Sequence, residues 1–288
     1  MNGNTQRIPL SPDQAQHENP DLLPTTLIQV PGLEHLSHSR IQGFLSCGLK
    51  FRFHYLDHIK PAFTPAPLAF GIAVHEAIEE ALAGMMVGTM TPVSELVAII
   101  EKSLQEQSRE LPIQFADEGG KEAMLELATR MMTAWTTWKR PDCRIIGIEH
   151  QFNVELAPGL PPLVGRIDII EDHGDEGLWL VDVKTSAKKW STREIEDHSP
   201  QLVLYREAVK DLARELGKPV RLCYEVITKT KTPVVERYLI TEAPEAIERQ
   251  VRIAELVVKA VENGIFIPMP GWACASCPWA GPCREWGR

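Results

Sequence analysis

Two apolar runs on either side of a turn-forming stretch constrain the fold of this chain most. The runs are LVGRIDIIE (residues 163–171) and LWLVDVK (178–184), and the stretch between them, DHGDEG, is rich in residues that favour turns. The pattern predicts a β-hairpin. Asp168 and Asp182 are equally far from position 175 in the middle of the turn. In a simple antiparallel hairpin they therefore face each other, with β-carbons about 5 Å apart.

One face of this hairpin carries groups suited to chemistry. Strand alternation places Lys184 on the same face as Asp182. The other face, which we expect to be core, carries Ile167, Ile169, Val181 and Val183. Two facing carboxylates repel unless a cation lies between them, and their oxygens suit Mg²⁺ or Mn²⁺. A neighbouring lysine favours hydrolysis of a phosphodiester by a metal-activated water. The alternative is that Asp182 and Lys184 merely form an ion pair on a solvated hairpin.

Hydrophobic periodicity divides the chain into parts. Residues 1–30 lack periodicity and are predicted to be a disordered or loosely attached arm, so a single domain is expected over 31–288. Its helical part covers about 37–140, with a short helix capped by Ser37 or Ser39 and helices at about 69–88, 92–109 and 119–139. Its sheet core covers about 143–240, with strands at about 143–156, 163–171, 178–184, 220–228 and 234–240. A helix opened by Ser199-Pro200 ends near Gly217, and a helix at 244–262 precedes a Cys-rich tail, so the last part covers about 244–288.

Charge and hydropathy narrow the class of protein. The formal net charge is −9, which argues against a general phosphate-neutralising surface, so any contact with nucleic acid must be local. No apolar run approaches the roughly 18 residues of a membrane helix, and the first residues lack the pattern of a secretory signal. We therefore expect a cytoplasmic protein without membrane association.

Four short motifs occur in a recognisable order. They are Gly71-x-x-x-His75, Gly165-Arg166-Ile167-Asp168, Asp182-Val183-Lys184 and Gln201-x-x-x-Tyr205. With these motifs the sequence resembles the PD-(D/E)XK nuclease superfamily, and within it the RecB-like branch that includes CRISPR-associated exonucleases. The resemblance spans about residues 36–286. It implies an α/β fold with a restriction-endonuclease-like core, in which a central mixed β-sheet is flanked by helices in three layers.

The resemblance also implies roles for the motif residues. His75, Asp168, Asp182 and the carbonyl of Val183 would bind the metal ion, and Lys184 would position or activate the attacking water. Gln201 and Tyr205 lie one turn apart on one helix face, and the resemblance puts them at the active-site rim in contact with DNA. His75 could instead pair with Glu79, and Tyr205 could belong to the core. Two departures, Asp182 where Glu is commoner and Gly48 where proline often follows the cysteine, remove no ligand.

Four of the six cysteines form a candidate metal-binding set. In a chain that we expect to be cytoplasmic, clustered cysteines indicate metal binding and not disulfide bonds. Cys274, Cys277 and Cys283 are close in sequence, and Cys47 completes the set if distant parts of the domain meet. Relatives with this arrangement carry a [4Fe–4S] cluster, and the resemblance implies one here. Zinc is the main alternative, and unligated thiols are the third possibility.

Two further expectations concern the surroundings of this set. Trp272, Trp279 and Trp286 alternate with the cysteines and are expected to shield the cluster from water. Cys143 and Cys223 fall in predicted strands and are expected to be buried core thiols, not ligands.

A local basic segment follows the hairpin. Lys188, Lys189 and Arg193 surround Trp190, and this combination of cations with one stacking surface suits single-stranded nucleic acid. The alternative is a solvated loop with an incidental tryptophan. Lys229 and Lys231 could extend the segment.

These patterns together predict a Mg²⁺- or Mn²⁺-dependent deoxyribonuclease, an exonuclease that acts on single-stranded DNA in DNA repair, recombination, phage or CRISPR-adaptation pathways. The alternative is a nuclease-like iron–sulfur protein that binds DNA without cleaving it. An iron–sulfur redox protein would leave the acidic hairpin unexplained. The sequence contains no G-x-x-x-x-G-K-[ST] loop, so unwinding would require a helicase or another recombination or CRISPR partner protein.

Overall fold

The predicted hairpin is confirmed in the computed structural model, which describes residues 33–115, 119–241 and 245–286. Strands β4 (Leu163–Asp172) and β5 (Leu178–Ser186) pair antiparallel, with Ile169 opposite Val181. This is the register expected from a turn centred on position 175. The arm predicted over residues 1–30 lies outside the described residues.

The hairpin lies inside a five-stranded sheet with the order β3-β4-β5-β6-β7. The other strands are β3 (Arg144–Val154), β6 (Val220–Thr228) and β7 (Val235–Ile240). β5 and β6 are parallel, whereas the other neighbouring pairs are antiparallel. A parallel pair needs a crossover connection, which α6 (Thr192–His198) and α7 (Pro200–Leu216) provide. The predicted mixed sheet is therefore confirmed.

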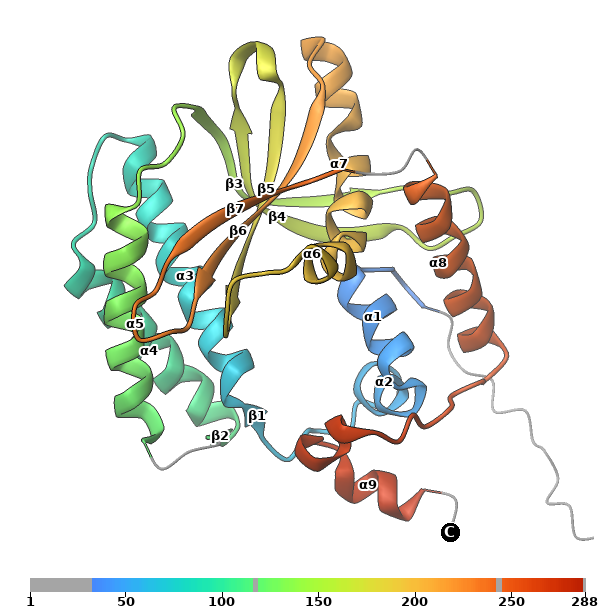
Figure 1. Ribbon diagram of the computed structural model, residues 1–288. Coiled ribbons are helices and arrows are strands. Elements are labelled where there is room, and N and C mark those ends of the chain that lie inside the picture. The colour runs from blue at the N-terminus through green and yellow to red at the C-terminus, as the bar shows by residue number, and fades with distance from the viewer. Residues whose placement is uncertain (1–32, 116–118, 242–244, 287–288) are drawn as a thin grey trace, which may run out of the picture.

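Helices cover both faces of this sheet (Figure 1). One face packs against α3 (Ala66–Met86), α4 (Val93–Glu110) and α5 (Gly120–Thr137). The other packs against α1 (His38–Ser46), α2 (Gly48–Tyr55), α7 and α8 (Ala246–Glu262). A short parallel pair, β1 (Thr64–Pro65) with β2 (Ile113–Gln114), lies apart from the main sheet. The expected three-layer α/β architecture is confirmed, and none of the described helices is both long and apolar enough to cross a bilayer.

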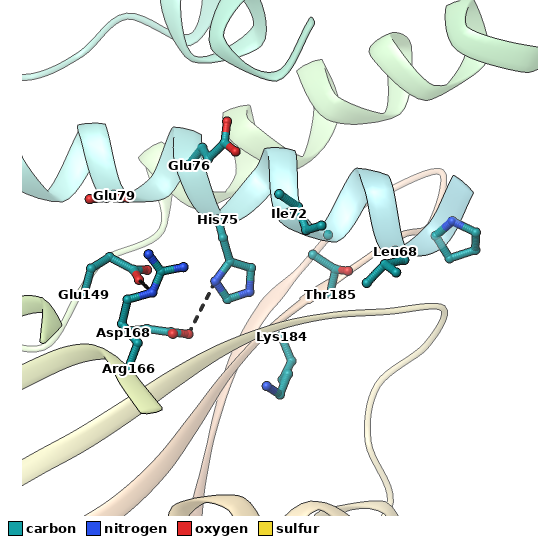
Figure 2. A pocket seen from close by; sticks show the side chains of 12 residues that line it. Leu68, Ile72, His75, Glu76, Glu79, Glu149, Arg166, Asp168, Lys184 and Thr185 are labelled. Atoms are coloured by element: carbon teal, nitrogen blue, oxygen red, sulfur yellow. Dashed lines mark ion pairs between the residues drawn. The ribbon is translucent and has the colours of Figure 1, made fainter. Parts of the chain in front are cut away.

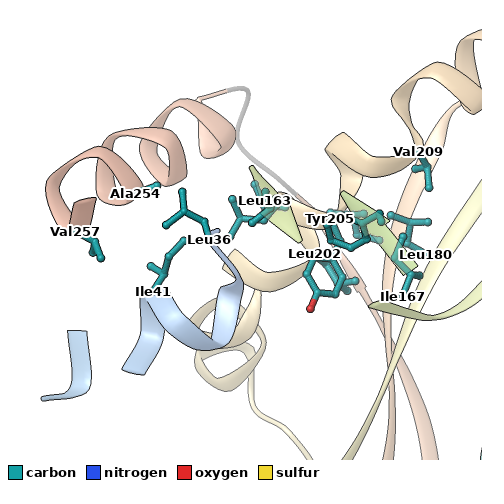
Figure 3. Packing of buried hydrophobic residues seen from close by; sticks show 14 of the residues in the cluster. Leu36, Ile41, Leu163, Ile167, Leu180, Leu202, Tyr205, Val209, Ala254 and Val257 are labelled. Carbon is teal, nitrogen blue, oxygen red and sulfur yellow. The ribbon is translucent and has the colours of Figure 1, made fainter. Parts of the chain in front are cut away.

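The hydrophobic core is split between the two faces. Leu180 and Tyr224 pack with α7 and α8 in one cluster, which Figure 3 shows together with Ala254 and Val257 of α8. Val181 and Val183 pack with α3, α4 and α5 in the other. The expectation that one hairpin face is core and the other is free for chemistry is therefore wrong, because helices bury both faces. The polar residues of the hairpin must lie where the packing is interrupted.

Such an interruption occurs in β4 at Asp168. Ile167 and Ile169 are two positions apart, so regular alternation would place them on one face, yet they belong to the clusters on opposite faces. Opposite this point, Glu149 of β3 falls between two paired positions of the ladder and has a φ of +48°. That conformation is uncommon for a residue with a side chain. The two strands are thus distorted where Asp168 lies.

The predicted helices α3, α4 and α5 begin and end within three residues of their expected limits. Ser37 caps α1 as expected, because its side chain accepts from the amide of Arg40 at 3.1 Å. Ser199 occupies the N-cap position of α7 and Pro200 begins the helix, as expected, but the Ser199 side chain does not cap it. Ser199 follows α6 directly, and its hydroxyl donates to the carbonyl of Glu196 at 2.8 Å. The sequence does not predict the short helices α2, α6 and α9 (Ala280–Glu285), which span too few residues for a periodic pattern.

A buried ion network lies between the sheet and α5. The carboxylates of Glu171 on β4 and Glu225 on β6 are fully buried. Arg237 of β7 donates to both of them at 2.7 to 3.0 Å, and Arg140 donates to both at 2.8 and 2.9 Å. Trp135 of α5 adds an indole hydrogen bond to Glu225 at 2.7 Å. The ion pairs of this network therefore link strands β4, β6 and β7.

Candidate functional site

Asp168 lies where β4 and β5 separate. The last paired positions of the hairpin are Ile169 and Val181, and beyond them the amide of Val183 donates to the Asp168 carboxylate at 2.7 Å. A side chain thus replaces the neighbouring strand as hydrogen-bond acceptor. The carboxylate is therefore held in the gap between the strands.

His75 reaches this carboxylate from α3. Its Nδ1 atom lies 3.5 Å from Oδ2 of Asp168, and Figure 2 shows the imidazole above the carboxylate. The predicted pairing of the first two motifs is therefore present. Glu149 completes a group in which one ligand atom each from His75, Glu149 and Asp168 lie within 4.8 Å of one another. Sequence motifs gave no sign of Glu149, because its place depends on the distorted stretch of β3.

Asp182 and Lys184 approach the same gap from β5. Asp182 is 2% exposed, and its Oδ2 atom lies 2.6 Å from the ammonium of Lys184. Gln201 of α7 donates to the other carboxylate oxygen at 2.7 Å. The second, third and fourth motifs thus converge, and both oxygens of Asp182 are engaged.

Tyr205 serves the core and borders the site. Its ring packs edge-on against Phe152 at a centroid distance of 5.0 Å, and it is 7% exposed. A β-carbon on Gly165 would lie 2.5 Å from Phe152 and 3.2 Å from Tyr205. The glycine of the second motif therefore makes room for these two rings, and Tyr205 lies one turn after Gln201 on α7.

Burial governs the protonation of this group. Burial and the neighbouring carboxylate of Asp182 raise the pKa of Asp168. Burial alone would lower the pKa of Lys184, but the charges of Asp182 and Asp168 outweigh it and raise that pKa. Burial lowers the pKa of His75, so its ring is neutral and keeps a lone pair. A divalent cation bound here would favour the ionised form of Asp168, and the neutral imidazole could bind the same cation.

The carboxylate of Asp168 is expected to destabilise the metal-free protein. Its pKa is raised in the folded state, so the penalty is complete above that pKa and is lost as the pH falls from it to the unfolded pKa of about 3.9. Asp168→Asn, which can still accept from Val183, should raise the melting temperature in EDTA at pH 8 by roughly 2–4 °C, equivalent to about 1 kcal/mol. Thermal melts at pH 8 and at pH 4, close to the unfolded pKa of about 3.9, measure this. An equal difference at both pH values would contradict the assignment, and Mn²⁺ should stabilise only the wild type.

A histidine that sequence reasoning missed lies nearby. Burial and the ammonium of Lys184 lower the pKa of His38, at the start of α1, to about 4. His198, at the end of α6, is affected in the same direction, by burial first and by Lys184 second. Neither belongs to a motif, so only the packing of α1 and α6 on the sheet reveals them.

The site opens into a cavity of about 420 Å³. Asp168, Lys184 and His75 lie on its wall, and Arg166, Glu149 and the apolar side chains of α3 complete it (Figure 2). A model of the PD-(D/E)XK nuclease superfamily matches residues 35–284 of the chain. The chain belongs to the PD-(D/E)XK nuclease superfamily. The three-layer fold agrees with the restriction-endonuclease-like core of this superfamily.

This PD-(D/E)XK nuclease also resembles solved structures. The crystal structure named "Putative exonuclease" from Eubacterium rectale is 15% identical, with 88% of each chain covered and a TM-score of 0.51. At that identity the likeness concerns the fold alone. The structure of SSO0001 is 12% identical over 85% of this chain and 94% of that one, and its TM-score of 0.36 carries no argument. No curated protein matches the chain.

Cys47 lies close to the C-terminal cysteines, as a shared metal-binding set would require. Cys47 lies between α1 and α2 and packs with Cys277 around Leu49, Phe53 and Trp279. Backbone and side-chain hydrogen bonds join the two segments, since Ala62 donates to Pro278 at 3.0 Å and Trp279 donates to Ile59 at 2.8 Å. A β-carbon on Gly48 would lie 3.0 Å from the amide of Ile267. Gly48 therefore permits a close approach between the segments.

The expected tryptophan shield is only partly present. Trp279 is buried, but Trp272 is 91% exposed and Trp286 is exposed as well. Cys223 is buried as expected, and burial raises its pKa to about 12. Cys143 is only half-buried and precedes β3, so its assignment to the core is wrong. It lies beside Glu171 and His173, whose polar atoms are already engaged by the buried ion network.

The basic segment after β5 is largely neutralised by acids. Lys188 pairs with Glu194 at 3.5 Å, Lys189 pairs with Glu236, and Arg193 lies 3.9 Å from Asp197. The Trp190 ring stacks on His198 at 4.4 Å with an interplanar angle of 6°. One face of that ring is therefore occupied from within the protein. The DNA contact predicted for this segment stays a prediction that these contacts do not favour.

Proposed function

We propose that this nuclease is a RecB-like deoxyribonuclease that holds Mg²⁺ or Mn²⁺ on His75, Asp168 and Asp182. The observation that supports this most is the position of the Asp168 carboxylate. It lies 3.5 Å from the imidazole of His75 and accepts from the backbone next to Asp182. Nitrogen and oxygen donors from a helix and two strands thus surround one point. A cation there would relieve the mutual repulsion of the carboxylates, and the carbonyl of Val183 remains a candidate further ligand.

The chain's own residues suit attack of water on phosphorus. A bound divalent cation would lower the pKa of a water molecule and offset the charge that develops on phosphate oxygens. Lys184 keeps its proton beside two carboxylates, so its ammonium can donate to that water or to a phosphate oxygen. Gln201 holds Asp182 from the opposite side and fixes its orientation. The attacking oxygen would thus meet pre-oriented groups.

We further propose that the substrate is single-stranded DNA and that cleavage starts from an end. The support is the match of all four motifs to the RecB-like branch, whose pathways include repair, recombination and CRISPR adaptation. A helicase partner would supply single strands. Linear single-stranded, circular single-stranded and linear duplex DNA should be incubated with the protein and Mn²⁺. We expect degradation of the linear single strand and survival of the circle; equal loss of the circle would contradict an exonuclease, and binding without any cleavage would favour the non-cleaving alternative.

We propose that Cys47, Cys274, Cys277 and Cys283 hold a [4Fe–4S] cluster. Such a cluster would join distant segments of the chain, and we propose that residues 31–288 form one domain. The other three thiols lie close enough to Cys283 to contribute, after burial, to its raised pKa. In a tetrahedral zinc site with bonds of about 2.3 Å, the sulfur atoms lie roughly 3.8 Å apart. Among the described residues, no three of these cysteines have sulfur atoms that all lie within 4.8 Å of one another. The wider spacing favours a larger inorganic group than a single zinc ion.

Metal analysis of anaerobically purified protein tests this assignment. We expect about four iron atoms per chain, a brown colour and absorption near 400 nm, as the family resemblance implies. Cys283→Ser should lose most of the iron, whereas the matched change Cys223→Ser, in the core away from the set, should keep it. Colourless protein with one zinc per chain would replace the cluster with a zinc site.

A further inference from the structure

Arg166 is a part of the second motif to which the proposed reaction assigns no role. Its side chain is 58% exposed and lines the same cavity as His75 and Asp168. Figure 2 shows its guanidinium between Glu149 and the imidazole of His75. Its position two residues before Asp168 on β4 places it within the site and not at a distance from it.

Glu149 holds Arg166 by one atom. The Nε atom of Arg166 lies 2.5 Å from Oε2 of Glu149, whose side chain is only 11% exposed. Glu149 occupies the left-handed backbone region with a φ of +48°, which is strained for a residue with a side chain. Strain of this kind persists where the surroundings demand it, and here it accompanies the contact with Arg166. The guanidinium is therefore oriented by a nearly buried acid.

The remaining donors of Arg166 are available to a ligand. A guanidinium has five N–H donors, and the contact through Nε leaves those of the two terminal nitrogens. In the described parts of the chain, these terminal nitrogens make no ion pair or hydrogen bond. Their fork geometry matches two oxygens of a phosphate.

The charge of the cavity gives this guanidinium its importance. The acids on the wall are Glu76, Glu79, Glu149 and Asp168, whereas the bases are Arg166 and Lys184. Lys184 is already held by Asp182 at 2.6 Å. A nucleic-acid strand that enters this acidic cavity of an acidic protein needs a local cation besides the metal. Arg166 is the cation on the wall with terminal donors to spare.

We propose that Arg166 binds the non-bridging oxygens of a DNA phosphate in the cavity and that Glu149 is the positioning residue that aims it. This inference rests on the proposed nuclease function, because it names how the substrate is held at that site. Glu149 does not need to contact DNA. It fixes the Nε edge of the guanidinium so that the terminal nitrogens face the strand.

Binding measurements in EDTA test Arg166 without cleavage. The affinity for a labelled single-stranded oligonucleotide is measured by anisotropy from 50 to 300 mM salt for the wild type, Arg166→Gln, Glu149→Gln and the control Arg130→Gln. Arg130 lies on α5 and pairs only with Glu126, one turn away. We expect Arg166→Gln to weaken binding about tenfold and to reduce the slope of log K against log salt by about 0.7, the value of one phosphate contact on a single strand. Glu149→Gln should weaken binding less and keep the slope, because the cation remains.

A second measurement identifies the phosphate itself. Methylphosphonate groups, which lack the charge, are placed at successive positions of the oligonucleotide. One position should weaken binding of the wild type and of Arg130→Gln, yet have no further effect on Arg166→Gln. Suppose that the wild type cleaves DNA with Mn²⁺, but Arg166→Gln shows the same salt slope and the same sensitivity to methylphosphonates as the wild type. This result would overturn the inference about Arg166 and leave the proposed nuclease function intact. A wild type that neither binds nor cleaves DNA would overturn the proposed function.

Discussion

Asp182→Asn should lower the rate of DNA cleavage with Mn²⁺ by about 10³-fold, the size of effect expected when a charged group at the reacting centre is lost. Asparagine keeps the size of the side chain and can still accept from Gln201. It removes the charge that would help to hold the metal, and it removes the partner of the Lys184 ammonium. The readout is the single-turnover rate on linear single-stranded DNA at saturating Mn²⁺.

The matched control is Asp197→Asn. Asp197 lies on α6 with its side chain 69% exposed, and its acidic group lies 3.9 Å from Arg193. Its replacement should leave the rate within about twofold, since exposed ion pairs contribute little. A thermal melt in EDTA should check that Asp182→Asn is folded at the assay temperature, because the substitution leaves the Lys184 ammonium without its charged partner. A rate within a few-fold of wild type for Asp182→Asn would show that the nuclease site lies elsewhere.

Arg237→Met should destabilise the protein by about 3–5 kcal/mol, the cost expected when one partner of a buried ion network is removed. The guanidinium donates to both Glu171 and Glu225, which are fully buried. Burial alone would raise the pKa of Glu171, but hydrogen bonds from Arg237 lower it to about 2. Methionine would leave two carboxylates with only Arg140 to offset them. Urea unfolding at pH 8 measures the loss.

The pH dependence separates this cause from a simple packing defect. In the wild type the stabilisation by Glu171 is present above its unfolded pKa and is lost only as the pH falls towards 2. In Arg237→Met the same carboxylate gains a proton more readily, so the deficit should shrink between pH 8 and pH 5. Arg144→Met is the control, because Arg144 is 76% exposed and pairs with Asp172 at 3.0 Å. It should cost at most about 1 kcal/mol. A deficit in Arg237→Met that does not change with pH would indicate lost packing instead.

The hairpin illustrates how much the sequence predicts. Its register follows from the turn length, because antiparallel pairing fixes every partner once the turn is centred. Spacing alone therefore brought Asp168 near Asp182, and the motifs added His75 and Gln201 from separate helices. These predictions depend on local pattern and on family resemblance, and both are readable along the chain.

The failures have a different origin. Glu171 and Glu225 lie in predicted strands, but no pattern in the sequence indicated that α5 and Arg237 bury them. Glu149 enters the site only because its backbone adopts a left-handed conformation. Trp190 was expected to face DNA, but its ring stacks on His198. Each of these depends on a contact between distant segments, which no local pattern encodes.

The contact between Cys47 and the C-terminal cysteines determines when the cysteine set can form. Trp279 and Ile59, which join the two segments, are 220 residues apart in sequence. Closing so long a loop has a high entropic cost, so contacts of this kind form late, after the sheet and its helices have brought the segments close. The four thiols can therefore meet only in a chain that has nearly finished folding. With the proposed cluster, iron content per chain would count the molecules that completed the fold, and partly folded molecules would be purified colourless.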